Sequence, residues 1–253
     1  CLDHMAFDGL ENAYDGKSMG IFADATAAKY GFTREMQDAF ATESVKRAQA
    51  AVASGAFKAE IAGVTVSGKG GETVLATDEP PGLCKPEKIP SLKPAFNKDG
   101  TVTAASSSSI SDGAAILILM KESEAKARGL TPLARVVGHA SNAHEPEWFT
   151  TAPVGAIDKL HKKLGWGPDS VDLYEINEAF AVVTMAAMKD LNLPHEKVNV
   201  NGGACALGHP IGASGARLIV TLIHALKARG GKRGIASLCI GGGEATALAV
   251  EII

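Results

Sequence analysis

The sequence predicts an α/β fold in which helices cover a layered sheet. Three observations support this. Short apolar runs alternate with stretches that carry apolar residues at helical spacing, mainly in the second half of the chain. Glycines and hydroxyl residues stand where several of these stretches would end or begin. The chain has 253 residues, 46% hydrophobic and 21% charged, which is the profile of a globular protein with room for two domain-sized units.

Charge and cysteine usage exclude several classes of partner. Lys plus Arg number 25 and Asp plus Glu number 28, for a net charge of −3. The chain contains no run of basic residues that would indicate a nucleic-acid partner. No stretch approaches the ~18 consecutive apolar residues of a membrane span, and no secretory signal is visible. The four cysteines show no metal-binding spacing. We therefore expect a cytoplasmic, reduced protein with no metal and no membrane segment.

The first hundred residues predict helices followed by irregular structure. Residues 19–55 read as two helices, the second capped by Thr33 and stopped by Gly55. Residues 61–99 are irregular apart from two short strands at 64–66 and 73–75. The proline-rich stretch 79–90 is expected to lie over the surface as a loop.

The second half predicts alternating strands and helices. The apolar run Ala114–Met120 is typical of a strand buried on both faces. A polar turn followed by a small-residue strand at 111–119 has a faint echo at 242–250. The expected strands are 114–120, 133–138, 171–176, 198–200, 235–239 and 245–252, and the expected helices are 122–128, 153–164, 178–190 and 213–229.

A glycine-rich loop around one histidine is the most informative feature. The run from Asn199 to Gly215 surrounds His209 with small residues and leads into a helix. An isolated loop histidine is usually a packed structural residue. Here the many glycines make the loop too flexible for a purely structural role, and a helix N-terminus offers amide donors to a thioester or phosphate.

A second glycine run carries a cysteine. Cys239 ends a strand and precedes Gly241–Gly243, a position suited to reactivity, although a lone cysteine is more often a small buried hydrophobe. The N–H of Gly241 is a candidate oxyanion donor. Asn177 follows another strand at the end where α/β sheets place ligands, and it could also cap a helix. A histidine and a cysteine in flexible loops predict thiol-based acyl chemistry.

These segments resemble the C-terminal signatures of the thiolases, the acetyl-CoA acetyltransferase family. Residues 177–181 resemble the family's NEAFA motif, and residues 100–115 resemble its substrate-binding loop. The resemblance implies a duplicated, layered sheet-and-helix fold with a loop and helical excursion domain. It places the excursion domain at 1–97, the end of the N-terminal half at 98–121 and the C-terminal half at 122–253. The chain is thus expected to match the C-terminal two-thirds of a thiolase.

The resemblance also implies an activity and the roles of four residues. The activity is acyl transfer between coenzyme A thioesters, either Claisen condensation of two acetyl-CoA or thiolysis of 3-ketoacyl-CoA, within fatty-acid metabolism. His209 would activate a nucleophilic cysteine from an N-terminal portion absent here. Cys239 would be the acid and base at the α-carbon, with a pKa drawn toward neutral. Asn177 would hold a water that binds the thioester oxygen with His209, and Gly241 would donate its amide.

Further residues are assigned by the same resemblance. Glu178 is expected to be a structural hydrogen-bond partner and Cys205 a core residue rather than the nucleophile. The thioester substrate is the only cofactor-like group implied, and the expected assembly is a homotetramer or homodimer. The residues expected to line the acyl and pantetheine sites are Leu10, Met19, Ser108, Ala179 and Phe180.

The residues are also compatible with two other functions. One is a ketoacyl-synthase-like condensing enzyme, although such sites are Cys-His-His or Cys-His-Asn and this chain carries Cys239 in the later segment. The other is a non-catalytic acyl-CoA-binding relative. Without an N-terminal portion the strand Ala114–Met120 would lack neighbours, so the chain is not expected to work as an enzyme alone.

Overall fold

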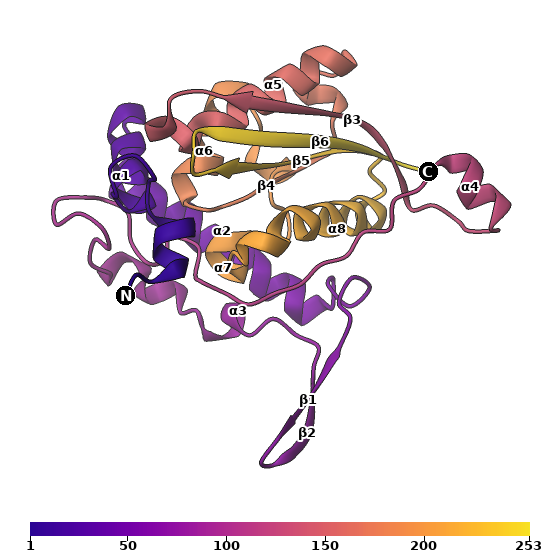
Figure 1. Cartoon of the computed structure of the whole chain (residues 1–253), viewed down its shortest axis with the longest axis horizontal. Helices are drawn as coiled ribbons and strands as arrows, with labels where there is room; N and C mark the ends of the chain where they lie inside the picture. The colour runs from indigo at the N-terminus through magenta and orange to yellow at the C-terminus, as the bar shows by residue number, and fades with distance from the viewer.

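A mixed four-stranded sheet forms the centre of the protein, which a computed structural model describes over residues 1–253 (Figure 1). The strand order is β3-β6-β5-β4, with β3 at one edge. β6 runs antiparallel to both β3 and β5, whereas β4 pairs with β5 in parallel. The strands are β3 (Ala134–Ala143), β4 (Leu173–Ile176), β5 (Arg233–Ile240) and β6 (Glu244–Ile252).

Helices cover both faces of this sheet, which confirms the predicted layering (Figure 1). α5 and α6 lie on one face, where Ile157 and Leu160 pack against Tyr174 and Ile235. α8 lies on the other, with Leu218, Leu222 and Leu226 against the sheet. The helices are α5 (Ala152–Leu164), α6 (Ala181–Leu191) and α8 (Ile211–Arg229).

α8 is long and apolar enough to cross a membrane, judged by length and composition alone. In the structure its leucines Leu218, Leu222 and Leu226 are almost fully buried against strands β4, β5 and β6. The apolar stripe of α8 therefore belongs to the sheet's core.

The two predicted N-terminal helices are present as α1 (Met19–Tyr30) and α2 (Arg34–Ser54). Thr33 caps α2 by accepting a hydrogen bond from the N–H of Met36 at 3.3 Å. Gly55 ends α2 in the left-handed conformation that favours glycine. α1 packs against α6, and α2 packs against both α6 and α7, so these helices close one end of the sheet layer.

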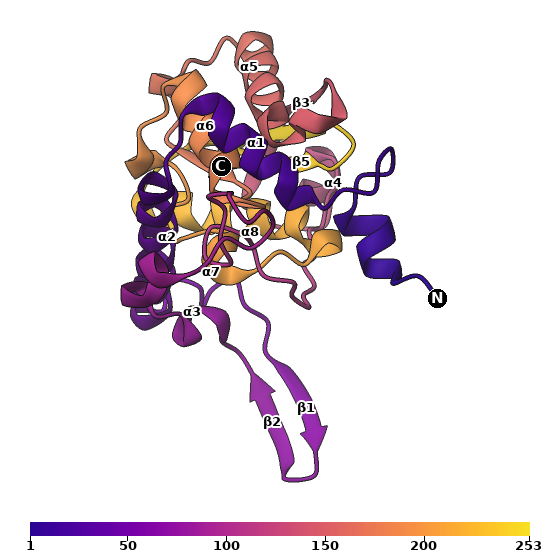
Figure 2. The same ribbon diagram turned by 90° about the vertical axis from the view of Figure 1, so that its left-hand side faces the viewer.

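The two predicted short strands form a hairpin, β1 (Val64–Gly68) and β2 (Gly71–Leu75), in which every residue is exposed. It projects away from the body of the protein (Figures 1 and 2). The proline-rich stretch after it is not a plain loop, because prolines at helix starts favour short turns there. The remaining short elements are a π-helix (Ala6–Leu10), α3 (Pro80–Leu83), α4 (Glu122–Ala127), α7 (Ala204–Leu207) and 3₁₀-helices at Pro86–Ser91, Pro146–Thr151, Pro168–Ser170 and His195–Lys197.

The prediction that Ala114–Met120 forms a buried strand is wrong. Ala114–Met120 pairs with no other strand, and Ile116 and Ile118 are 83% and 82% exposed. An apolar run becomes a strand only where a neighbour supplies N–H and C=O partners, and none lies beside this segment.

Two boundaries also differ from prediction. Residues 198–200 make only a single bridge, between Val198 and Tyr174, because Asn199 takes a positive φ of 48° and turns the chain away. The helix expected from residue 178 begins at 181, after Phe180 in its N-cap position, so Asn177 is not a helix cap.

No further strand pairs with the outer edge of β4, and there the side chain of Asn199 supplies hydrogen bonds to the backbone of Ile176. Its Oδ1 accepts from the N–H of Ile176, and its Nδ2 donates to the carbonyl of Ile176, both at 2.8 Å. Nδ2 also donates to Oε1 of Glu178 at 2.8 Å. Since all three residues are buried, one amide satisfies backbone and carboxylate groups that water cannot reach.

We predict that Asn199→Ala lowers the free energy of unfolding by about 4 kcal/mol, because the N–H of Ile176 and Oε1 of Glu178 lose their partner and the carbonyl of Ile176 keeps only the hydroxyl of Thr184 at 3.3 Å. Denaturant unfolding of parent and variant measures it. Asn192→Ala is the matched control, because Asn192 also has a positive φ but is exposed, and about 1 kcal/mol is expected there. Equal losses in the two variants would contradict the role of the Asn199 side chain.

Candidate functional site

His209 lies in the turn between α7 and α8, held by its backbone and neighbours. Its N–H donates to the carbonyl of Ser109 at 3.1 Å. Gly208 has a φ of +88°, and a Cβ there would collide with the Ser111 side chain. Glycine is therefore required at position 208 because of its positive φ and because the chain passes too close to residues 109–111 for a side chain.

A hydrogen bond that sequence reasoning missed sets the tautomer of His209. Nδ1 of His209 lies 2.6 Å from Oγ of Ser214, and that hydroxyl donates to the carbonyl of Pro210 at 3.0 Å. A hydroxyl has one proton, so Ser214 must accept from Nδ1–H. Nε2 of His209 is then the unprotonated nitrogen, available as a base.

Asn177 faces that free nitrogen. Its Nδ2 lies 3.2 Å from Nε2 of His209 and donates to it, since Nε2 carries no proton. The Oδ1 of Asn177 is buried and has no partner in the protein. The predicted pair of Asn177 and His209 is thus brought together from β4 and the α8 turn, with one acceptor left open for a water or ligand.

His209 is neutral over the physiological range. Burial, and to a lesser extent the charge of Arg217, lower the pKa of His209 to about 4. The imidazole can therefore accept a proton at neutral pH, and the imidazolium forms only when a reaction supplies one.

Cys239 is the penultimate residue of β5 and is buried in an apolar cluster with Ala179, Phe180 and Cys205. Burial raises the pKa of the Cys239 thiol to about 12. The expectation that this pKa is drawn toward neutral differs from the structure, because apolar side chains surround the sulfur and disfavour the thiolate. In this state Cys239 is a protonated thiol, ready to donate.

Gly241 lies in the turn between β5 and β6, beside Met19 at the start of α1. A Cβ on Gly241 would come within 3.1 Å of the Met19 sulfur and methyl group. The N–H of Gly241 makes none of the turn's backbone hydrogen bonds. Its amide is thus a free donor at the end of the strand that carries Cys239.

The other predicted binding residues fall into two groups. The N–H and Oγ of Ser108 both donate to the carbonyl of Ala179, at 3.1 and 3.0 Å, which ties the serine run to Ala179 and the buried Phe180. Leu10 stands apart, half-buried at the end of the π-helix, and its neighbour Gly9 lies near Ile211.

Glu178 and Cys205 have structural surroundings. The Glu178 carboxylate accepts from Ser44, Asn199 and the N–H of Cys205, at 2.6, 2.8 and 3.1 Å. Burial raises the pKa of both Glu178 and the Cys205 thiol. Cys205 is thereby held as a neutral thiol, unsuited to nucleophilic attack.

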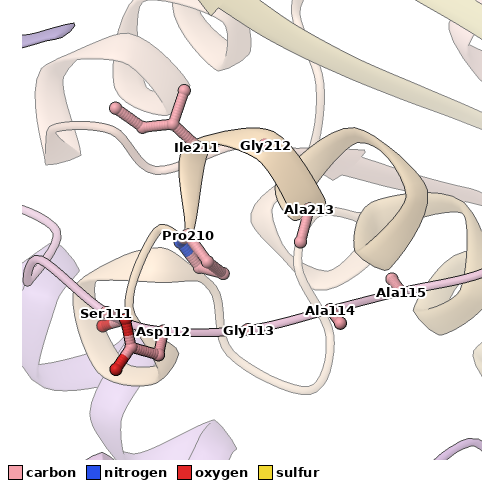
Figure 3. Close-up of a pocket in the computed structure, with 9 residues that line it drawn as sticks. All are labelled: Ser111, Asp112, Gly113, Ala114, Ala115, Pro210, Ile211, Gly212 and Ala213. Carbon is pink, nitrogen blue, oxygen red and sulfur yellow. The ribbon is translucent and has the colours of Figure 1, made fainter.

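An open cavity of about 420 Å³ adjoins the His209 turn. In Figure 3, residues 111–115 run beneath the first turn of α8, with Asp112 near Pro210. No group of three or more histidine, cysteine or carboxylate side chains is arranged to hold a metal ion. The cavity lining is Ser111, Asp112, Gly113, Ala114, Ala115, Pro210, Ile211, Gly212 and Ala213.

Comparison with known proteins gives a consistent family assignment. The model of the thiolase N-terminal domain matches residues 1–123, and that of the thiolase C-terminal domain matches residues 130–252. The expectation that the match covers only the C-terminal two-thirds of the family is corrected, since both domain models match. A probable acetyl-CoA acetyltransferase from Dictyostelium discoideum is 51% identical over 99% of this chain and 61% of its own length.

Two solved structures share the fold. The acetyl-CoA acetyltransferase of Bacillus anthracis aligns over 100% of this chain and 66% of its own, with a TM-score of 0.95 and 44% identity. The Acat5 thiolase of Ascaris suum, solved with coenzyme A, aligns over 100% and 64%, with a TM-score of 0.89 and 42% identity. The chain spans 61% and 64% of the length of two acetyl-CoA acetyltransferases that it matches.

We predict that Ser214→Ala releases the tautomer of His209. Without an acceptor for Nδ1–H, the neutral ring should populate the Nε2–H form, which ¹⁵N chemical shifts of the imidazole report. Ser237→Ala removes another buried hydroxyl, bound to the carbonyl of Thr246, and should leave those shifts unchanged. Parent-like shifts in Ser214→Ala would contradict the assignment.

Proposed function

The chain belongs to the thiolase family, and from that premise we propose that it transfers acyl groups between coenzyme A thioesters. The reaction is condensation of two acetyl-CoA to acetoacetyl-CoA, or thiolysis of a 3-ketoacyl-CoA. One observation carries the proposal: the unprotonated Nε2 of neutral His209 faces Asn177 at 3.2 Å, beside the strand that carries Cys239.

In the acyl-transfer step, Nε2 of His209 takes the proton of an attacking thiol. The thiolate adds to the thioester carbonyl, and the new Nε2–H donates to the oxyanion together with a water held by the open Oδ1 of Asn177. As the carbonyl re-forms, the bond to the coenzyme A sulfur breaks and that sulfur takes the proton from Nε2, which leaves His209 neutral again. The family's nucleophilic cysteine is the attacking thiol in this proposal, and none of this chain's four cysteines, Cys1, Cys84, Cys205 and Cys239, is assigned that role.

In the carbon–carbon step, Cys239 exchanges a proton with the α-carbon. Its protonated state supports the thiolysis direction, in which the thiol donates to the enolate as the carbon–carbon bond breaks. In condensation the thiolate removes the α-proton, and the free N–H of Gly241 stabilises the enolate oxygen. Because burial holds this thiol protonated, Cys239 must pass its own proton to another base before it removes an α-proton in the condensation direction.

The rest of the proposal follows the family resemblance. Ala179 and Phe180 line the thioester pocket, Leu10 and Met19 line the pantetheine tunnel, and Ser108 contacts pantetheine. The division at residues 97 and 121, the homotetrameric or homodimeric assembly, the cytoplasmic location and the part in fatty-acid metabolism are further elements of this proposal. No cofactor beyond the thioester substrate is part of it. The likeness to the Ascaris suum thiolase solved with coenzyme A supports that substrate.

We predict that His209→Ala, made in the intact enzyme that carries the nucleophilic cysteine, lowers the rate of acyl transfer by about 10²–10⁴-fold, the usual contribution of a general base. Acylation by acetyl-CoA, followed by mass spectrometry or release of coenzyme A, measures it. The fold should survive, because the half-buried ring lies in a turn. An unchanged acylation rate would remove His209 from the mechanism.

We predict that Cys239→Ala separates the two steps. Acyl transfer needs no α-proton removed, so it should persist, whereas condensation and exchange of solvent deuterium into acetyl-CoA should be lost. Cys205→Ala, which changes another buried thiol of the same cluster, is the matched control and should retain exchange. Exchange at the parent rate in Cys239→Ala would rule out Cys239 as the base.

A further inference from the structure

A second polar pair runs beside the His209–Asn177 pair and joins the same two elements. Glu175 precedes Asn177 by two residues on β4, so both side chains lie on the face that carries Leu173 and packs against α8. Arg217 follows Ser214 by three residues on α8, one turn further along the same face. Nη1 of Arg217 lies 3.6 Å from Oε2 of Glu175.

This pair is buried and incompletely satisfied. Glu175 is 1% exposed, and its Oε2 has no hydrogen-bond partner. Nη1 and Nη2 of Arg217 also lack one. Burial raises the pKa of Glu175 to about 8, and the charge of Arg217 offsets part of that rise, so removing Arg217 would leave this buried carboxyl group without its only nearby cation.

Arg217 also lies near the base of the projecting hairpin. Thr221, one turn further along α8, donates to Oε1 of Glu60 at 2.9 Å, and Oε2 of Glu60 is buried without a partner. The charge of Arg217 acts on Glu60 and on Asp78, the carboxylates that flank β1 and β2 in sequence. One guanidinium thus lies among carboxylates from three segments.

We propose that Arg217 is a positioning residue of this site. Paired with Glu175, it holds the first turns of α8, with Ser214 and His209, against the strand that carries Asn177, and it ties the base of the β1–β2 hairpin to the same point. The charged groups around it are Glu175 and Glu178 from β4 and its exit, Glu60 after α2, Asp78 after β2 and His209 before α8.

This role has a consequence at His209 that a merely structural ion pair would lack. A positive charge near the imidazole disfavours its protonation, and Arg217 contributes to the lowered pKa of His209. Loss of the charge should therefore move the His209 titration to higher pH. Loss of the guanidinium geometry alone should instead loosen the His209–Asn177 contact.

The test compares Arg217→Met and Arg217→Lys in the intact enzyme that carries the nucleophilic cysteine. A ¹⁵N-imidazole NMR titration of His209 should show a midpoint near pH 4 in the parent, a higher midpoint in Arg217→Met, and a smaller change in Arg217→Lys, which keeps the charge. Both variants should lose about tenfold or more in kcat for acyl transfer with little change in KM, because the base is displaced rather than the substrate site.

Arg233→Met is the matched control. Arg233 pairs with Glu251 at 3.3 Å near the start of β5, the end opposite Cys239, so its loss should leave the His209 midpoint and kcat unchanged. A folded Arg217→Met with the parent midpoint overturns the proposal. If Arg217→Met fails to fold, Arg217→Lys decides it, and parent-like kcat in that variant overturns it.

The kinetic part rests on the proposed acyl-transfer function, whereas the titration needs no substrate. If the parent transfers no acyl group but the His209 midpoint shifts in Arg217→Met, the proposed function is contradicted and the positioning role is not. If the parent transfers acyl groups normally but the His209 midpoint is unchanged in Arg217→Met, the positioning role is contradicted and the proposed function is not.

Discussion

The packing of α8 against β4 is the contact on which the rest of the site depends. On the apolar side it is a layer of leucines against the sheet, and on the polar side it is Arg217 facing Glu175. His209 enters just before α8 and Asn177 leaves just after β4, so this interface sets the distance between them. Because a packed interior yields little to small displacements, two loop residues far apart in sequence are held at hydrogen-bonding distance without a direct covalent constraint.

Burial acts in opposite ways on the polar groups around this interface. Glu178 and Asn199 are fully enclosed, yet their hydrogen bonds with one another, with Ser44 and with the backbone make them a rigid support. His209 and Asn177 have fewer hydrogen-bond partners. The neutral ring of His209 has one unprotonated nitrogen, and the amide oxygen of Asn177 has no partner in the protein. Unsatisfied groups are expected where a protein reserves contacts for a ligand, whereas satisfied groups mark the supporting structure.

Much of the fold could be predicted from local patterns. The helices α1, α2, α5 and α8 follow from apolar spacing with a cap at Thr33 and stops at Gly55 and Gly165, signals that act within one or two turns. Ala114–Met120 could not be predicted in the same way. Its composition is that of a buried strand, but strand formation requires a neighbour, and periodicity carries no information about neighbours.

Residue type and order are enough to single out the residues that could act: His209 and Cys239 in glycine-rich turns, with Asn177 at a strand end. How these residues can be used depends on their surroundings in the folded chain. The tautomer of His209 depends on Ser214 and the carbonyl of Pro210, and the high pKa of Cys239 depends on the apolar side chains around it. The role of Arg217 depends on Glu175 and Glu60 arriving from distant segments. Hydrogen-bond direction, desolvation and charge proximity are properties of three-dimensional surroundings, and residues distant in sequence create those surroundings.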